Sequence, residues 1–173
     1  MQAIIGLPED QQTLLKAWEL ALQSQDDLCL FKVLEQQGIA HCMHSEFNQA
    51  CAKFEEARTL MERLLSSATQ DQSELSMRHI IFLSNYGQVK LEMQEPEEAL
   101  HLRSAALNLA RQRGDPLLTG LRLLDYGEVL AALRHEEEAR QSYQEATIIF
   151  RRLGAKGQEV TAQKMLSMLG TTL

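Results

Sequence analysis

The chain has 173 residues, of which 45% are hydrophobic and only 5% aromatic. This composition excludes a disordered polymer and disfavours a β-sandwich, which needs frequent turns and strands of β-branched or aromatic residues. The net charge of −7 argues against nucleic acid or an anionic membrane as the partner. The three cysteines form no CxxC pair and no apolar run is long enough to span a membrane, so we expect a cytoplasmic, all-α protein.

Helical periodicity and turn residues predict eight helices. In chain order they are expected at 9–24, 27–44, 46–65, 74–93, 96–113, 116–133, 136–152 and 156–169. Ser45 and Asp115 are residue types that suit helix N-caps. Pro96 and Pro116 suit the first position of a helix, and Gly114 suits a helix C-terminus.

Three segments share a pattern of small residues. A glycine is followed 12 residues later by an alanine, and after a further 7 residues by a second alanine. The triplets are Gly38, Ala50 and Ala57; Gly87, Ala99 and Ala106; and Gly127, Ala139 and Ala146. Small residues allow two helices to cross closely, so three triplets in register predict a repeat of helix–turn–helix units.

The second alanine of the triplet also recurs at Ala17, which gives spacings of 40, 49 and 40 residues. The longer spacing contains a run of polar residues over 66–73, which we expect to be an insertion loop. We therefore expect one domain over 1–173. Its parts are a half repeat at 9–25, repeats at 27–65, 74–113 and 115–153, the insertion loop, and a capping helix at 156–169 whose apolar face carries Val160, Met165, Leu166 and Leu169.

These segments resemble tetratricopeptide repeats, a family of helix–turn–helix units that stack into a right-handed superhelical solenoid. The resemblance rests on the glycine–alanine triplets and on the large apolar residue four positions before each glycine, namely Leu34, Leu83 and Leu123. The chain is most similar to the subtype with longer repeats, in agreement with the 40-residue spacings. It departs from the family pattern at Gln37 and Lys90, in usually apolar positions, and at Arg103, in a usually aromatic one. The expected fold is a solenoid of about three and a half repeats plus the capping helix.

In this family, the first helix of each unit lines a concave groove that binds segments of partner proteins. The resemblance places ten ligand-binding candidates in this groove: Lys32, Glu35, Ile39, Ser84, Asn85, Gln88, Glu92, Leu121, Leu124 and Glu128. Apolar, amide and acidic side chains suit a peptide or helical segment that is apolar with basic flanks. Two alternatives remain: the capping helix packs part of this set, and Asn85 is only a solvated polar residue.

Other functional classes find little support. Relatives that bind chaperone tails grip a carboxylate with cations, but this chain has acidic or apolar residues at those positions: Glu35, Ile39, Leu124 and Glu128. His41 and His44 provide two ligands, which do not close a zinc site, and no catalytic or phosphate-binding motif is present. We expect no metal, cofactor or catalytic residue, and a protein-binding adaptor. The alternative is an assembly or sensor module of a larger regulator, or a homo-oligomer, that packs through its terminal helices.

Overall fold

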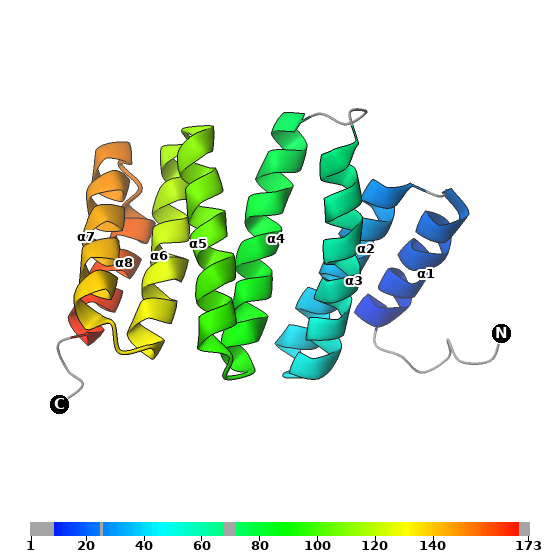
Figure 1. Cartoon of the computed structure of the whole chain (residues 1–173), viewed down its shortest axis with the longest axis horizontal. Helices are drawn as coiled ribbons and strands as arrows, with labels where there is room; N and C mark the ends of the chain where they lie inside the picture. The colour runs from blue at the N-terminus through cyan, green and yellow to red at the C-terminus, as the bar shows by residue number, and fades with distance from the viewer. Residues whose placement is uncertain (1–8, 25, 68–71, 170–173) are drawn as a thin grey trace. The chain divides into compact units, whose positions relative to one another are not determined.

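The computed structural model describes residues 9–24, 26–67 and 72–169, and within these ranges it contains eight helices and no strand (Figure 1). The helices are α1 (Glu9–Ser24), α2 (Asp27–Met43), α3 (Phe47–Ser66), α4 (Gln72–Glu92), α5 (Pro96–Arg113), α6 (Pro116–Ala132), α7 (Glu136–Leu153) and α8 (Lys156–Met168). The predicted all-α repeat fold is confirmed. Each helix begins and ends within two residues of its expected bounds.

The connection between α3 and α4 is shorter than the insertion loop expected at 66–73. Ser66 is the last residue of α3, and Gln72 is the first residue of α4. Residues 68–71 lie outside the described part of the chain.

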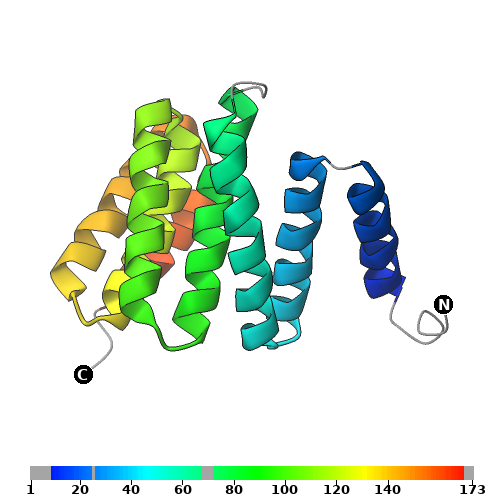
Figure 2. The same ribbon diagram turned by 45° about the vertical axis from the view of Figure 1, so that its right-hand side comes forward.

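The chain divides into two compact units, Met1–Leu75 and Ser76–Leu173, with the boundary near the beginning of α4. In the first unit, α2 packs against both α1 and α3. In the second unit, α6 packs against α5 and α7, and α7 packs against α8. Figures 1 and 2 show α6 and α7 as neighbouring antiparallel helices. The expected organisation as one domain stays a prediction.

Three turns between paired helices have the same backbone geometry. Ser45, Gln94 and Arg134 each follow a repeat glycine by 7 residues and adopt positive φ angles of 60°, 61° and 63°. The next residue in each turn donates its backbone N–H to the carbonyl oxygen five residues earlier, at 2.9 Å in all three cases. The repeat is therefore present in the backbone as well as in the sequence.

The glycine–alanine triplets lie where the paired helices cross. All six alanines of the triplets are fully buried: Ala50, Ala57, Ala99, Ala106, Ala139 and Ala146. A Cβ atom added to Gly38 would lie 2.7 Å from the ring of Phe54, and one added to Gly127 would lie 2.5 Å from the ring of Tyr143. The small residues are therefore required by the close approach of the helices.

The helix ends confirm most of the expected turn chemistry. The carboxylate of Asp115 accepts the backbone N–H of Leu118 at 3.0 Å and caps α6, and Gly114 ends α5 with a φ of 71°. Pro96 and Pro116 are the first residues of α5 and α6. The N-cap expected at Ser45 is wrong, because that residue occupies the left-handed position of the turn.

The helix α8 covers the end of the hydrophobic core of the second unit. Ala162 is fully buried there, and Met165, Leu166 and Leu169 are partly buried against the same core. Val160, which was expected on this face, is 64% exposed. Two residues correspond to a rotation of about 200° around a helix, so Val160 and Ala162 lie on opposite sides of α8.

Candidate functional site

The buried guanidinium of Arg103 lies at the centre of a group of polar side chains in the second unit. Arg103 projects from α5 and is only 2% exposed. Its Nη1 donates to the backbone oxygen of Asp125 and to Oε2 of Glu128, both at 2.6 Å. Its Nη2 donates to Oε1 of Gln88. One side chain of α5 thus joins α4 and α6.

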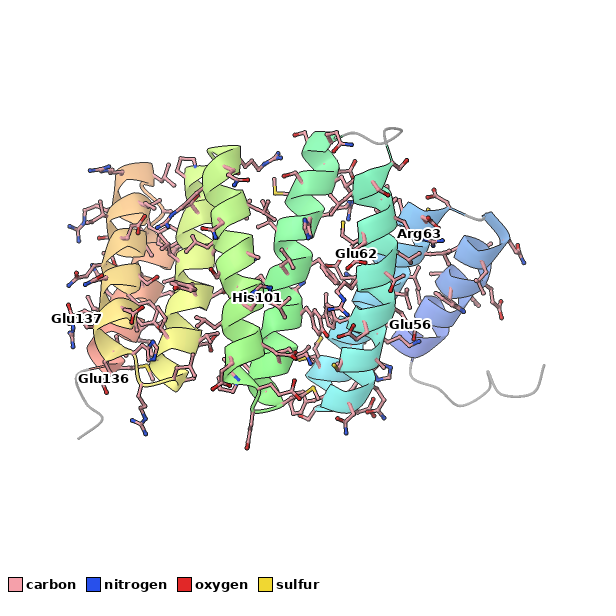
Figure 3. All side chains as sticks on the ribbon, viewed as in Figure 1. Glu56, Glu62, Arg63, His101, Glu136 and Glu137 are labelled. Atoms are coloured by element: carbon pink, nitrogen blue, oxygen red, sulfur yellow. The ribbon has the colours of Figure 1, made fainter. Side chains whose placement is uncertain are left out.

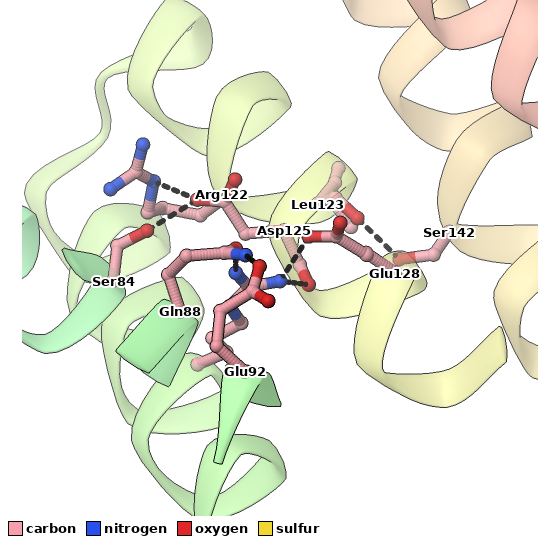
Figure 4. Close-up of polar contacts among 9 residues, drawn as sticks. Ser84, Gln88, Glu92, Arg122, Leu123, Asp125, Glu128 and Ser142 are labelled. Atoms are coloured by element: carbon pink, nitrogen blue, oxygen red, sulfur yellow. Dashed lines mark hydrogen bonds and ion pairs between the residues drawn. The ribbon is translucent and has the colours of Figure 1, made fainter. Parts of the chain in front are cut away.

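The contacts extend on both sides of this guanidinium (Figure 4). The amide Nε2 of Gln88 donates to Oε1 of Glu92 at 2.8 Å. The hydroxyl of Ser84 donates to Oδ2 of Asp125 at 2.5 Å, and Nε of Arg122 lies 3.0 Å from the same oxygen. We call this set the polar network: Ser84, Gln88, Glu92, Arg103, Arg122, Asp125 and Glu128.

The polar network is acidic at the surface and basic in the interior. It contains three carboxylates and two guanidiniums, so its formal charge is −1. The side chain of Glu128 is 42% exposed and that of Asp125 is 28% exposed, against 2% and 13% for Arg103 and Arg122. Burial lowers the pKa of Arg122, and the charge of Asp125 partly opposes this shift. The groups offered to solvent are therefore mainly carboxylate oxygens.

A pocket of about 490 Å³ lies beside Glu128, on the side of the polar network that faces α7 and α8. It is lined by residues of α6, α7, α8 and the α6–α7 turn: Glu128, Ala131, Ala132, Arg134, Glu136, Tyr143, Met165, Met168 and Leu169. Burial raises the pKa of Tyr143 to about 12, and the charge of Glu128 contributes to this shift. The phenol of Tyr143 therefore stays neutral to a higher pH than an ordinary tyrosine.

The structure separates the groove candidates of the second unit into two groups. Ser84, Gln88, Glu92 and Glu128 come together in the polar network. Leu124 is only 8% exposed and belongs to the hydrophobic core, with Leu121 partly buried against it. Leu124 therefore has little surface to offer to a partner, and its role in binding stays a prediction. The same core packs against α8, as the capping-helix alternative expected.

Asn85 has no part in the polar network. It is half-buried on α4, one residue after Ser84. The two hypotheses for Asn85, a hydrogen bond to a peptide backbone and a solvated polar position, both stay open.

The remaining candidates lie on α2 in the first unit. Lys32 and Ile39 are half-buried, and Glu35 is only 6% exposed. On the same helix, Nδ1 of His41 lies 2.6 Å from Oε2 of Glu46. The burial of Glu35 gives it little surface to offer to a partner.

Sequence reasoning missed three residues of the polar network: Arg103, Arg122 and Asp125. In the sequence, Arg103 stands out only as a departure from a usually aromatic position. The length of the arginine side chain is the signal that would have indicated contacts with the neighbouring helices. Elsewhere, the described residues contain no group of three or more His, Cys, Asp or Glu side chains that could hold a metal ion. No helix among them is long and apolar enough to cross a membrane.

Comparison with known proteins shows similarity of fold. No family model matches the chain, and no curated protein matches it in sequence. The Rap conjugation gene regulator of the plasmid pLS20, solved in complex with the Phr* peptide, matches with a TM-score of 0.70 and 13% identity, over 98% of this chain and 42% of that chain. BtubC (BKLC) from P. vanneervenii matches with a TM-score of 0.71 and 18% identity, over 92% of this chain and 62% of that one. This chain thus spans less than two thirds of either structure, and the likeness supports a helical repeat fold.

Proposed function

We propose that this chain is a tetratricopeptide-type repeat protein that binds a peptide or helical segment of a partner and is not an enzyme. The observation that carries the proposal is the polar network, in which Ser84, Gln88, Glu92 and Glu128 come together from two helices. The resemblance to tetratricopeptide repeats places these residues among the groove candidates. A rigid face that connects two repeats suits the recognition of an extended or helical segment.

The chemistry of this face favours a partner with basic side chains. The two terminal nitrogens of Arg103, the hydroxyl of Ser84 and the amide of Gln88 already donate within the polar network, and Nε of Arg103 is buried away from a partner segment. The exposed groups of Glu92 and Glu128 are carboxylates, which only accept hydrogen bonds when ionised. A segment with lysine or arginine beside apolar residues supplies the missing donors and the opposite charge.

The Rap regulator provides independent support from a protein of similar fold. That protein was solved in complex with a peptide, and the similar region covers 98% of this chain. A helical repeat of this kind is therefore compatible with peptide binding. We propose the same general role here, with the partner chemistry derived from this chain's own residues.

Titration calorimetry with a partner captured by crosslinking in the native cell tests the proposal. Glu92→Lys is expected to weaken binding, more strongly at low salt, because this carboxylate is exposed. Glu62→Lys is the matched control, since Glu62 is exposed on α3 and carries the same charge (Figure 3). Equal losses for the two variants would contradict binding at the polar network.

Exposed apolar residues on α8 favour a second candidate function. Val160 is 64% exposed and Met168 is 60% exposed, so this helix offers apolar surface for association with a copy or another domain. Light scattering over a range of protein concentrations distinguishes the two functions. A dimer that Val160→Glu converts to a monomer would favour the assembly module, whereas a monomer at all concentrations would favour the adaptor.

A further inference from the structure

Arg103 occupies a position that holds an aromatic ring in the other two repeats. Phe54, Arg103 and Tyr143 each follow a repeat glycine by 16 residues. The ring of Phe54 packs against Gly38, the ring of Tyr143 packs against Gly127, and Cγ of Arg103 lies 2.8 Å from a Cβ atom added to Gly87. The aliphatic stem of Arg103 therefore fills the space that a ring fills elsewhere.

The guanidinium extends beyond that space and holds two side chains of the proposed binding face. Glu128 on α6 receives Nη1 at 2.6 Å, and Gln88 on α4 receives Nη2. With its oxygen held by Arg103, Gln88 directs its Nε2 to Oε1 of Glu92 at 2.8 Å. A chain of contacts thus leads from a buried cation to an exposed carboxylate.

The three carboxylates of the polar network differ in their partners. Glu128 is paired with Arg103 and Asp125 is paired with Arg122. Glu92 is exposed and is held by the neutral amide of Gln88, and the ion pairs found among the described residues do not include it. Glu92 therefore carries the one charge of this network that has no cationic partner within it.

We propose that Arg103 is a positioning residue that orients Glu92 through Gln88, and that Glu92 receives a lysine or arginine side chain of a partner segment. Glu128, already neutralised by Arg103, holds the network together and is not the site of charge recognition. This proposal rests on the proposed function, since it names the partner chemistry of the same face.

The experiment compares variants of the full chain by nuclear magnetic resonance and by titration. The probe is a short amphipathic peptide of leucine and lysine, with a leucine–glutamate peptide of equal length as the control ligand. Glu92→Gln is expected to weaken binding of the basic peptide roughly three- to fivefold. The control Glu62→Gln is expected to stay within about twofold of the parent.

The variant Arg103→Phe separates positioning from packing, because phenylalanine stands at the equivalent position of the first repeat. It is expected to remain folded and to free the side-chain amide signal of Gln88. Its affinity does not report on positioning alone, because Glu128 loses its cationic partner in this variant. Gln88→Met, which keeps that pair, is the variant expected to bind the basic peptide as weakly as Glu92→Gln. Arg103→Lys keeps the charge for Glu128 but lacks the second donor arm, so the Gln88 signal is expected to stay free. If Arg103→Phe does not fold, Gln88→Met cuts the same link while leaving the contact of Arg103 with Glu128 in place.

Three outcomes would overturn parts of this proposal in distinguishable ways. An unchanged Gln88 signal in folded Arg103→Phe would reduce Arg103 to a packing residue. Unchanged affinity in Gln88→Met would do the same if Arg103→Phe does not fold. Failure of the parent chain to bind the basic peptide, or equal binding of the acidic one, would overturn the proposed partner while the Gln88 signal still reports on Arg103.

Discussion

Replacing Gly127 by alanine would place a methyl group where the ring of Tyr143 already lies. The added Cβ would stand 2.5, 2.8 and 3.0 Å from three ring carbons of Tyr143, which is itself 3% exposed. A ring in a filled core cannot move aside without displacing its neighbours, and such overpacking costs about 1–3 kcal/mol. Alanine recovers about 1 kcal/mol through its higher helix propensity, so a net loss of up to about 2 kcal/mol is expected.

Two other glycines provide matched controls for this substitution. Gly157 lies in α8 with no neighbouring atom within 4 Å of an added Cβ, so Gly157→Ala is expected to stabilise by about 0.5–1 kcal/mol. Gly114 has equally open surroundings but a φ of 71°, so Gly114→Ala is expected to cost about 1 kcal/mol through backbone strain. The three variants separate steric overlap, helix propensity and backbone strain.

Urea and thermal unfolding, followed by far-ultraviolet circular dichroism, measure these differences. For a chain of this size, each kcal/mol corresponds to about 2–4 °C in Tm. If Gly127→Ala were as stable as Gly157→Ala, the close crossing of α6 and α7 would be wrong. A second substitution, Tyr143→Leu, should recover part of the loss in Gly127→Ala if the ring is the obstacle.

Three further perturbations test other parts of the fold. Ala99→Leu and Ala139→Leu, at fully buried crossings, are expected to cost about 1–3 kcal/mol in urea unfolding, and melting like the parent would refute the register. Asp115→Ala removes the cap of α6 and should cost about 1 kcal/mol in the same assay. Asp115→Asn should keep most of the stability of the parent, because asparagine also caps helices well. Tyr143 has a folded pKa near 12 against an ordinary 10. Folding therefore favours the neutral phenol, and the free energy of unfolding should fall by about 1.4 kcal/mol per pH unit as the pH rises from 10 to 12. Tyr143→Phe should lack this part of the pH dependence, and identical pH profiles for the variant and the parent would contradict the assignment to Tyr143.

The positions of the helices could be predicted because small residues are needed wherever helices cross. Gly127 and Ala139 mark such a crossing regardless of which larger residues surround them. Turn details were harder to predict, since residue type indicates a preference and not a φ angle. Ser45 is a good N-cap type, yet the turn requires a left-handed residue at that position, as it does at Gln94 and Arg134.

The candidate site was only partly predictable for a different reason. The resemblance to tetratricopeptide repeats placed Gln88, Glu92 and Glu128 in one groove, and they lie together in the polar network. A repeat position does not indicate depth: the groove candidate Leu124 is only 8% exposed and lies in the core. It also does not indicate how far a long side chain extends. Arg103 projects into the site from α5, the second helix of its repeat.

Polar residues at usually apolar positions have partners elsewhere in the second repeat and its neighbour. Arg103 has Gln88 and Glu128, and Lys90, 10% exposed, has Glu95 at 2.8 Å and Glu98 at 2.7 Å. Such a departure from the repeat pattern therefore predicts that acceptors lie within reach of the buried cation. The physical reason is that a buried charge without a partner is far more costly than a solvated one.

Lys90 allows this compensation to be measured, because the equivalent position of the third repeat is Leu130, which is 1% exposed. Lys90→Leu removes the buried cation and leaves Glu95 and Glu98 at 41% and 64% exposure, where water can solvate them. We expect the free energy of unfolding to change by less than about 1 kcal/mol. Replacing both acids with Glu95→Gln and Glu98→Gln instead leaves the ammonium buried near the ring of Tyr86, with neutral amides in place of these two carboxylates, at a cost of up to about 3 kcal/mol. Urea unfolding of the two variants should therefore differ markedly, and equal losses would show that the ion pairs themselves, and not the burial of an unpaired charge, determine stability at this position.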